Sequence, residues 1–266
     1  MTVDDLTEQF TGFQAELKSF LLRMTASVQD AEDIVQETYL KAHAKLDSFR
    51  GESTLKTWVF TIASNLARDL LRAKKRWPEN VTDICKDAVL NDREFFQEAL
   101  HIRQTTPQGN FEIKEHVAFC FTCISRSLPL EQQIALLLKE VYGFKVQEIA
   151  TIMEQSEAMV KYYLHVSRGR MIDIFDQRCA LINKQGVCHQ CTELNGIFNP
   201  KQKTQEEIVK LEMARDAENK DKEDLFDLRM KILQELDPFE SGAAALQLHH
   251  LEHNRKLMEK HLGESE

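Results

Sequence analysis

One histidine and two cysteines recur at helical spacing in the stretch EHVAFCFTC, residues 115–123. His116, Cys120 and Cys123 stand at offsets of 0, 4 and 7 positions. Because a helix turns by about 100° per residue, the three side chains would leave one helix within a sector of about 60°. Imidazole and thiolate are ligands that zinc prefers, and a structural zinc site is tetrahedral. The stretch therefore predicts most of the ligands of a structural zinc ion.

Such a site needs a further ligand from elsewhere in the chain. The segment GVCHQC offers Cys188 and Cys191. Weaker candidates are Cys179, His189 and Cys85. Two other interpretations stay open: a buried core position, since free cysteine is often buried, and a redox pair formed by Cys120 and Cys123 as a CxxC motif. We expect one structural zinc ion and no other cofactor.

The composition favours a mostly helical protein without catalytic machinery. The chain has 266 residues, 42% of them hydrophobic, with nine glycines and five prolines. This length suits about two domains, and the scarcity of turn residues argues against a sandwich or barrel. We therefore expect an all-α protein. Because no Ser, His or Asp lies in a nucleophile motif or a glycine-rich turn, we also expect that it is not an enzyme.

Neither a membrane span nor a signal peptide is apparent in the sequence. No apolar run reaches about 18 residues, the length that a spanning helix needs. The N-terminus MTVDDLTEQF is acidic and lacks a basic-then-apolar signal. We therefore expect a cytoplasmic protein.

The charge is unevenly distributed along the chain. The net charge of −9 argues against a protein that binds nucleic acid unaided. Eleven basic and sixteen acidic residues fall in residues 200–266, so over half of the net charge lies in the last quarter. For any contact with nucleic acid, local clusters of basic residues therefore matter more than the net charge of the whole chain.

Hydrophobic periodicity divides the chain into two helical domains, a linker and an extension. The first domain spans residues 1–77, with Ser27 as a helix N-cap and a break at Gly51. Its third helix is expected to bury the apolar stripe Leu55, Trp58, Val59, Ile62, Leu66 and Leu70. The linker, residues 78–112, is polar and predicted to be irregular, with one short helix near residues 94–102.

The second domain spans residues 113–178 and contains a helix-turn-helix pattern. Helices are predicted over Glu131–Tyr142, Val146–Met153 and Glu157–Ile174, the last two joined by a tight turn. The C-terminal extension, residues 179–266, begins with a cysteine-containing segment and continues as charged amphipathic helices.

Two segments together resemble one protein family. DAEDIVQETYLKAHAKLDSFRGESTLKTWVFTIASNLARDLLRAKKR, Asp30–Arg76, resembles region 2 of bacterial extracytoplasmic-function (ECF) sigma factors. SLPLEQQIALLLKEVYGFKVQEIATIM followed by SEAMVKYYLHVSRGRM, Ser127–Met171, resembles region 4. The resemblance implies a promoter-specificity subunit whose partners are promoter DNA and the β′ and β subunits of core RNA polymerase. The alternative is a helix-turn-helix regulator that is not a sigma factor, which would leave the region 2 resemblance unexplained.

By this resemblance the helix DAEDIVQETYLKA docks on the polymerase β′ subunit. Offsets of 0, 3, 4 and 7 place four candidate side chains on one helix face. The candidates for core-polymerase binding are Asp33, Gln36, Glu37 and Leu40.

The basic end NLARDLLRAKKR is predicted to hold DNA at the minus-10 element. Cations on phosphates fix the register of a strand, although a basic helix end is also often a solvated C-cap. The candidates are Asn65, Arg68, Arg72, Lys74, Lys75 and Arg76. Trp58 is interpreted as a core residue rather than a stacking platform.

The helix SEAMVKYYLHVSRGR is predicted to read the minus-35 element in the major groove. The candidates are Ser156, Glu157, Lys161, Tyr162, His165 and Arg168. The residues expected to face the core are Met159, Val160, Leu164 and Met171. Adjacent tyrosines depart from the usual family pattern, so the resemblance does not predict the promoter sequence.

The extension has a structural and a regulatory interpretation. As a regulatory arm it would replace or supplement an anti-sigma factor, and its acidic helices would mask DNA-reading surfaces. The HxxxCxxC spacing resembles that of zinc-binding anti-sigma domains, and zinc would fasten the extension to the minus-35 reader. We expect the histidines of the extension, His249, His250 and His253, on a solvated helix face.

Overall fold

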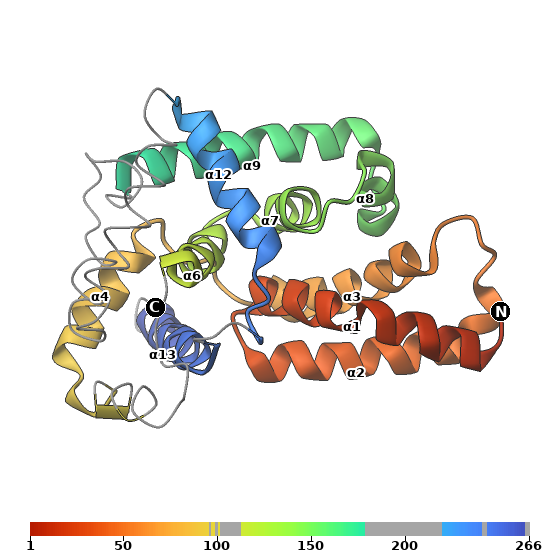
Figure 1. The fold of residues 1–266 in the computed structure, drawn as a ribbon, viewed down its shortest axis with the longest axis horizontal. Coiled ribbons are helices and arrows are strands. Elements are labelled where there is room, and N and C mark those ends of the chain that lie inside the picture. Colours follow the sequence, from red (N-terminus) through yellow and green to blue (C-terminus); the bar gives the residue numbers. More distant parts are fainter. Residues whose placement is uncertain (96, 99–100, 102–112, 179–219, 241–243, 264–266) are drawn as a thin grey trace. The chain divides into compact units, whose positions relative to one another are not determined.

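The computed structural model describes residues 1–95, 97–98, 101, 113–178, 220–240 and 244–263 (Figure 1). All regular elements in these ranges are helices, which confirms the all-α prediction. The helices form two compact units, each discontinuous in sequence. Residues 1–76 and 128–168 make the first unit, and residues 77–127 and 169–266 make the second.

Three long helices begin the first unit: α1 (Val3–Thr25), α2 (Val28–Ala44) and α3 (Leu55–Arg72) (Figure 1). The side chain of Ser27 caps α2 by accepting a hydrogen bond from the Asp30 amide at 3.1 Å. Thr54 caps α3 in the same way, through the Thr57 amide. Such caps satisfy amides that have no partner inside the helix, so these two helix starts are fixed by local sequence.

The same unit contains the helix-turn-helix: α7 (Leu130–Leu136), α8 (Val146–Met153) and the first half of α9 (Glu157–Arg178). A π-helical turn, Leu137–Val141, extends α7 until Gly143, whose φ of 70° is easily adopted by glycine. The three helices expected in this segment are therefore present.

Aromatic side chains form the core that joins these helices. Phe60 on α3 is fully buried, with its ring centre 5.5 Å from that of Phe20 and 4.9 Å from that of Phe144. Phe20 also meets Tyr142 edge-on at 5.6 Å. The first three helices and the helix-turn-helix thus share one hydrophobic core.

The buried face of α3 differs from the expected stripe. Phe60 is buried, whereas Leu70 is 36% exposed and Trp58 is only half-buried against Phe49. The reason is that α7 and α8 pack on α3 in addition to α1 and α2, so the helix buries a wider and rotated surface.

The second unit is built around α6 (Ile113–Ser125). It is covered by α4 (Val81–Asn91), α12 (Lys222–Glu235) and α13 (Ala244–Gly263), and it includes the end of α9. Helix α4 corrects the prediction of an irregular start to the linker, because Val81 and Cys85 are buried on its inner side.

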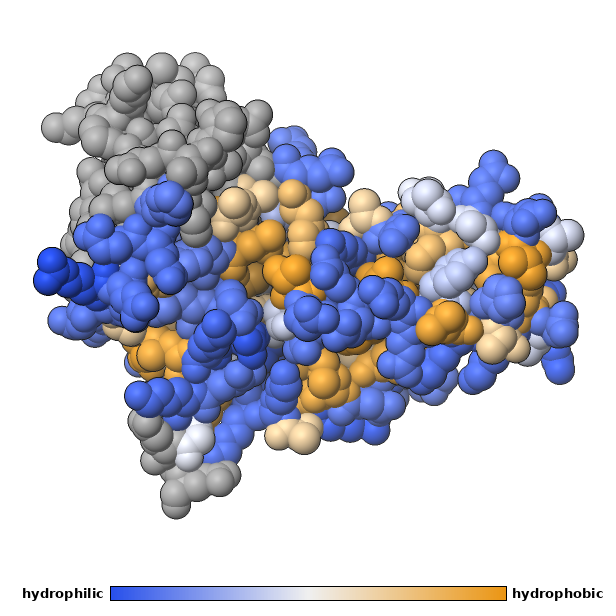
Figure 2. All heavy atoms as spheres, turned by 90° about the horizontal axis from the view of Figure 1, so that it is seen from below, coloured by the Kyte–Doolittle hydropathy of each residue, from blue (hydrophilic) through white to orange (hydrophobic). Residues whose placement is uncertain are grey.

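Figure 2 shows that hydrophilic side chains cover most of one face of the molecule, with smaller apolar patches between them. Among the described residues, the large hydrophobic side chains that are exposed are Met1, Val3, Leu40, Leu70, Met159 and Tyr162. No helix of the described ranges has the length and apolar character that crossing a membrane requires.

Candidate nucleic-acid interface

The four residues predicted to bind core polymerase lie on the outer face of α2. Asp33, Gln36, Glu37 and Leu40 are all exposed, and Leu40 is 66% accessible. Their neighbours Ala31, Ile34, Val35 and Thr38 are buried. A solvated apolar side chain among acidic ones is suited to contact a partner, so this face remains the predicted docking surface.

The predicted minus-10 residues do not form one exposed cluster. Arg72 and Lys75 are exposed, whereas Arg68 is only 7% accessible. The Arg68 guanidinium lies 3.1 Å from the carboxylate of Glu131 on α7 and donates to Asn65 at 2.5 Å. Because α7 packs on this side of α3, the Arg68 side chain makes contacts inside the unit and is not exposed for DNA.

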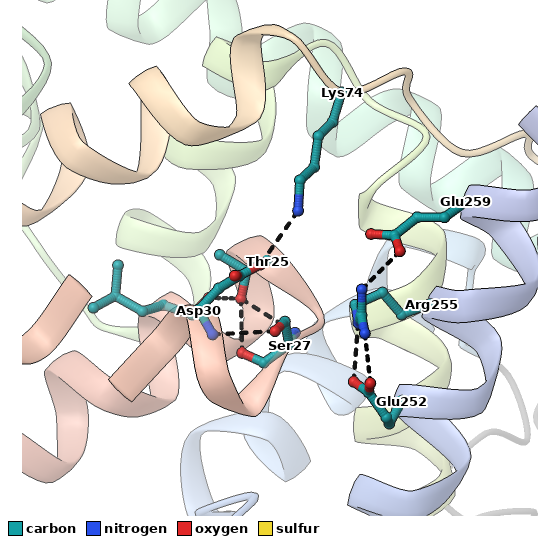
Figure 3. A network of polar contacts seen from close by, with 8 residues as sticks. Thr25, Ser27, Asp30, Lys74, Glu252, Arg255 and Glu259 are labelled. Carbon is teal, nitrogen blue, oxygen red and sulfur yellow. Dashed lines mark hydrogen bonds and ion pairs between the residues drawn. The ribbon is translucent and has the colours of Figure 1, made fainter. Parts of the chain in front are cut away.

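The end of the basic segment is also engaged within the unit. Arg76 donates hydrogen bonds to the Leu128 carbonyl and the Gln133 side chain. Burial lowers the pKa of Arg76 to about 10. Lys74 reaches the Asp30 carboxylate at 3.3 Å (Figure 3). Thus Arg72 and Lys75 are the predicted cations with exposed side chains.

A buried polar layer beneath this surface was not predicted. Gln133 is fully buried and donates to the Arg23 carbonyl, while Arg23 donates to the Tyr142 hydroxyl at 3.2 Å. Burial raises the pKa of Tyr142. The sequence signal was an arginine inside the apolar run FLLRM of α1, since a buried arginine needs a partner.

The recognition helix α9 exposes most of the predicted minus-35 residues. Ser156, Glu157, Lys161, Tyr162 and His165 are exposed. The Ser156 hydroxyl accepts a hydrogen bond from the Met159 amide at 3.2 Å, so it caps the start of the helix. The first turns of α9 are therefore presented to solvent.

Two residues of α9 lie differently from the prediction. Arg168 is turned inward, with 28% of its side chain exposed and a 3.3 Å ion pair to Glu140. Met159, expected in the core, is 40% exposed. The buried face is centred on Val160, Ser167 and Met171, and Met159 lies about 100° from Val160 around the helix.

The described residues of the predicted zinc site lie on α6. Cys123 is 1% exposed, and its sulfur faces the Asn254 amide of α13 at 3.8 Å. Burial raises the pKa of the Cys123 thiol to about 12 and that of Cys85 as well. Cys120 is half-buried.

The remaining candidate ligands are not described. The His116 side chain and residues Cys179, Cys188, His189 and Cys191 lie outside the described part of the chain. Within the described part, no three His, Cys, Asp or Glu side chains are placed so that they could hold a metal ion. Zinc binding therefore stays a prediction.

The histidines of α13 do not lie on a solvated face, contrary to our expectation. Their rings surround Phe95 of the linker segment, with centres 4.7 Å (His249), 4.9 Å (His250) and 3.9 Å (His253) from the phenyl ring. His253 lies 3.4 Å from Asp92. The helical pattern of α13 alone did not reveal which segment covers it.

A second set of polar contacts lies within α13 itself. Arg255 lies between Glu252 and Glu259 on successive turns and donates to both carboxylates, to Glu259 at 2.7 Å (Figure 3). These hydrogen bonds raise the pKa of Arg255 and lower that of Glu252. The helix thus carries its own charge network beside the histidines.

The histidine cluster should make the second unit sensitive to acid. Burial lowers the pKa of His249 from its usual 6.5; Glu98 opposes this shift, and His253 and Lys256 add to it. Because the folded state favours neutral His249, its contribution is present above the unfolded-state pKa and is lost as the pH falls through the lower folded-state pKa. Urea unfolding between pH 7.5 and pH 5 should show this loss.

The variant His249→Gln should flatten that pH dependence. The matched control is His165→Gln, because His165 is exposed on α9. An unchanged slope in His249→Gln would rule out His249 as the source.

Comparison with known proteins supports the same organisation. The sigma-70 region 2 model matches residues 10–77, and the sigma-70 region 4 model matches residues 118–171. The ECF RNA polymerase sigma-E factor of Haemophilus influenzae is 35% identical over 135 residues, which cover 50% of this chain and 68% of that protein. The RNA polymerase sigma-H factor of Pseudomonas aeruginosa is 28% identical over 142 residues, covering 53% and 71%.

The sigma factor RpoE of Bartonella quintana, crystallised with the anti-sigma factor NepR, is a further match among solved structures. It is 24% identical in sequence and aligns with a TM-score of 0.43, covering 65% of this chain and 98% of that chain.

Regions 2 and 4, in this order, define a sigma factor, a subunit that binds core RNA polymerase and promoter DNA and is not an enzyme. The chain belongs to the ECF sigma factors, and residues 172–266 extend beyond the matched regions. The region 2 match excludes the alternative of a regulator that is not a sigma factor.

Proposed function

We propose that this ECF sigma factor directs initiation at a restricted promoter set, using three separate surfaces. The outer face of α2 binds core polymerase, Arg72 and Lys75 hold the minus-10 strand, and the first turns of α9 read the minus-35 element. The observation that carries the proposal is the simultaneous exposure of these surfaces on the matched regions. Its site of action is the cytoplasm, where promoters and polymerase are found.

Two sets of variants test this division of labour in transcription with reconstituted holoenzyme. Lys161→Ala should weaken binding to the minus-35 element by about 1–3 kcal/mol if a base contact is lost. Arg72→Ala with Lys75→Ala should instead weaken open-complex formation and reduce its salt dependence, because fewer counterions are released.

The readouts are transcripts from a genomic promoter library and binding at several salt concentrations. Glu8→Ala, at an exposed position on α1, is the matched control and should behave as wild type. Identical promoter profiles for both variant sets would contradict the assignment. Absence of both core binding and promoter-dependent transcripts would overturn the proposed function.

The extension is proposed to regulate region 4. Its helix α12 packs on α6, which carries the start of the region 4 match. Near the end of α9, Lys222 pairs with Asp173 at 2.7 Å, and the Arg229 guanidinium lies 4.5 Å from the centre of the Phe175 ring. Contact with the start of the region 4 match and with residues just after its end supports an arm that changes how the DNA-reading helix is presented, alongside or in place of an anti-sigma factor.

We also propose a zinc site that would join α6 to the start of the extension. Thiolates of Cys120 and Cys123 with Cys188 or Cys191, together with His116, would hold a structural zinc ion that fastens the extension to α6. Zinc binding releases the thiol protons, so a ligand thiol with a raised pKa in the metal-free fold would bind as thiolate only when the metal is present.

One experiment addresses both proposals: promoter-specific transcription by full-length protein and by a truncation after Asn199, each with and without a chelator. We expect more transcript from the truncation at equal core saturation. Metal analysis by mass spectrometry should find about one zinc per full-length chain, as a structural site requires.

Two cysteine variants sharpen the metal analysis. The zinc should be lost in Cys120→Ser and kept in Cys85→Ala. Equal transcription by the full-length protein and the truncation would show that the extension has only a structural role. Absence of metal from protein prepared under reducing conditions would rule out the zinc site.

A further inference from the structure

The first turns of α9 present an apolar surface to solvent. Met159 is 40% exposed and Tyr162 is 56% exposed, and Ala158 beside them is also exposed. Among the described residues, six large hydrophobic side chains are exposed, and two of them stand here, one turn apart. Met159 and Tyr162 therefore form a small apolar patch rather than single scattered apolar residues.

The charged residues of the same turns lie to one side of this surface. Glu157 and Lys161 are one helical turn apart, and their charged groups approach within 3.9 Å of each other. Ala158 and Tyr162 share the next helix face, directly opposite the buried Val160 and Ser167. In the first two turns the outward face is therefore centred on apolar side chains, and the exposed His165 follows one turn farther along the same face.

Neighbouring side chains support this surface. The Tyr162 ring lies 6.0 Å from the Tyr163 ring, which is half-buried. The Met159 amide donates to the Ser156 cap, which fixes the helix start. Farther along, Arg168 is held by Glu140, so it does not add a cation to the face.

In a helix-turn-helix, the N-terminal residues of the recognition helix contact base edges in the major groove. The major groove offers one apolar group for such contacts, the C5-methyl of thymine, whereas arginine and lysine recognise guanine. An apolar first turn therefore fits thymine better than guanine.

We propose that Ala158, Met159 and Tyr162 select thymine in the minus-35 element by packing on its C5-methyl group. This inference rests on the proposed function of α9 as the minus-35 reader. It assigns specificity to Ala158, which was not among the predicted minus-35 residues, and to Met159, which was expected to face the core, and it names the chemical group that they recognise.

The test uses holoenzyme reconstituted with full-length protein and a promoter obtained from the library. Each thymine of the minus-35 element, on either strand, is replaced singly by deoxyuridine, which removes only the methyl group. We expect about a fourfold loss of promoter binding at one or two positions, the size expected for one buried methyl group.

The variant Met159→Gln should bind the thymine and uracil templates equally at the affected position. The matched control is Val3→Gln, at a valine that is 43% exposed on α1; it should retain the fourfold preference.

Three results would overturn the inference while leaving the sigma-factor function intact. They are promoters without thymine in the minus-35 element, equal binding of all uracil templates by wild type, or a Met159→Gln defect confined to core binding. The last would assign the apolar face to a protein partner. Absence of any promoter-dependent binding would instead be a failure of the proposed function.

Discussion

Replacement of Phe226 by Ala is expected to lower the free energy of unfolding of the second unit by about 3–5 kcal/mol, the usual cost of deleting a large buried side chain. Phe226 on α12 is fully buried, and α12 packs on α6. The cost combines lost burial of the ring with the cavity that it leaves. Thermal and urea unfolding, followed by circular dichroism, would measure the loss.

Lys231→Ala is the matched control for this variant, because Lys231 is exposed on the same helix. Surface changes of this kind usually stay within about 0.5 kcal/mol. Equal stabilities of the two variants would mean that α12 does not pack on α6 in solution.

The same variant separates structural from regulatory effects of the extension. Loosening α12 should expose part of α6 while the acidic residues of the extension remain in the chain. If Phe226→Ala and the truncation after Asn199 change transcription alike, docking of α12 is the regulatory contact. A change in the truncation alone would point to electrostatic masking.

Replacement of Glu131 by Ala is expected to lower the free energy of unfolding of the first unit by about 2–4 kcal/mol. Removing one partner of a buried ion pair leaves the other charge uncompensated, at a cost of about 3–5 kcal/mol. The side chain of Glu131 is 33% exposed and that of Arg68 only 8%, so solvent at Glu131 reduces the expected loss. Arg68 would retain its hydrogen bond to Asn65 alone.

The control is Glu37→Ala, which removes a surface pair with Lys41 at 2.9 Å. Exposed pairs contribute about 0.3–0.5 kcal/mol on a helix. The double variant Arg68→Met with Glu131→Leu should recover most of the stability, because matched apolar groups replace the pair. A loss no larger than that of Glu37→Ala would show that α7 does not pair with α3.

Local sequence was sufficient to predict much of the fold. Ser27 and Thr54 cap helices through amides three positions away, and Gly143 ends a helix through its own backbone conformation. These interactions involve near neighbours, so they follow from residue type and spacing. The outer face of α2 was also predictable, since periodicity alone separates its exposed residues from its buried ones.

Only the tertiary structure decided which polar residues are buried and form contacts inside the fold. Arg68 resembles its exposed neighbours in sequence, yet it pairs with Glu131 because α7 packs on α3. Likewise, the histidines of α13 are covered by Phe95 of a segment far away in the chain. Periodicity identifies a helix face but does not name its long-range partner.

The reading face of α9 illustrates both sources of information. The sequence by itself determined that a helix-turn-helix is present and that its second helix begins after Ser156. Packing determined the rotation of that helix: burial of Val160, Ser167 and Met171 turns Met159 outward, and Glu140 draws Arg168 inward. A rotation of about 100° separates adjacent residues on a helix, so the choice between neighbouring positions depends on contacts that only the folded chain supplies.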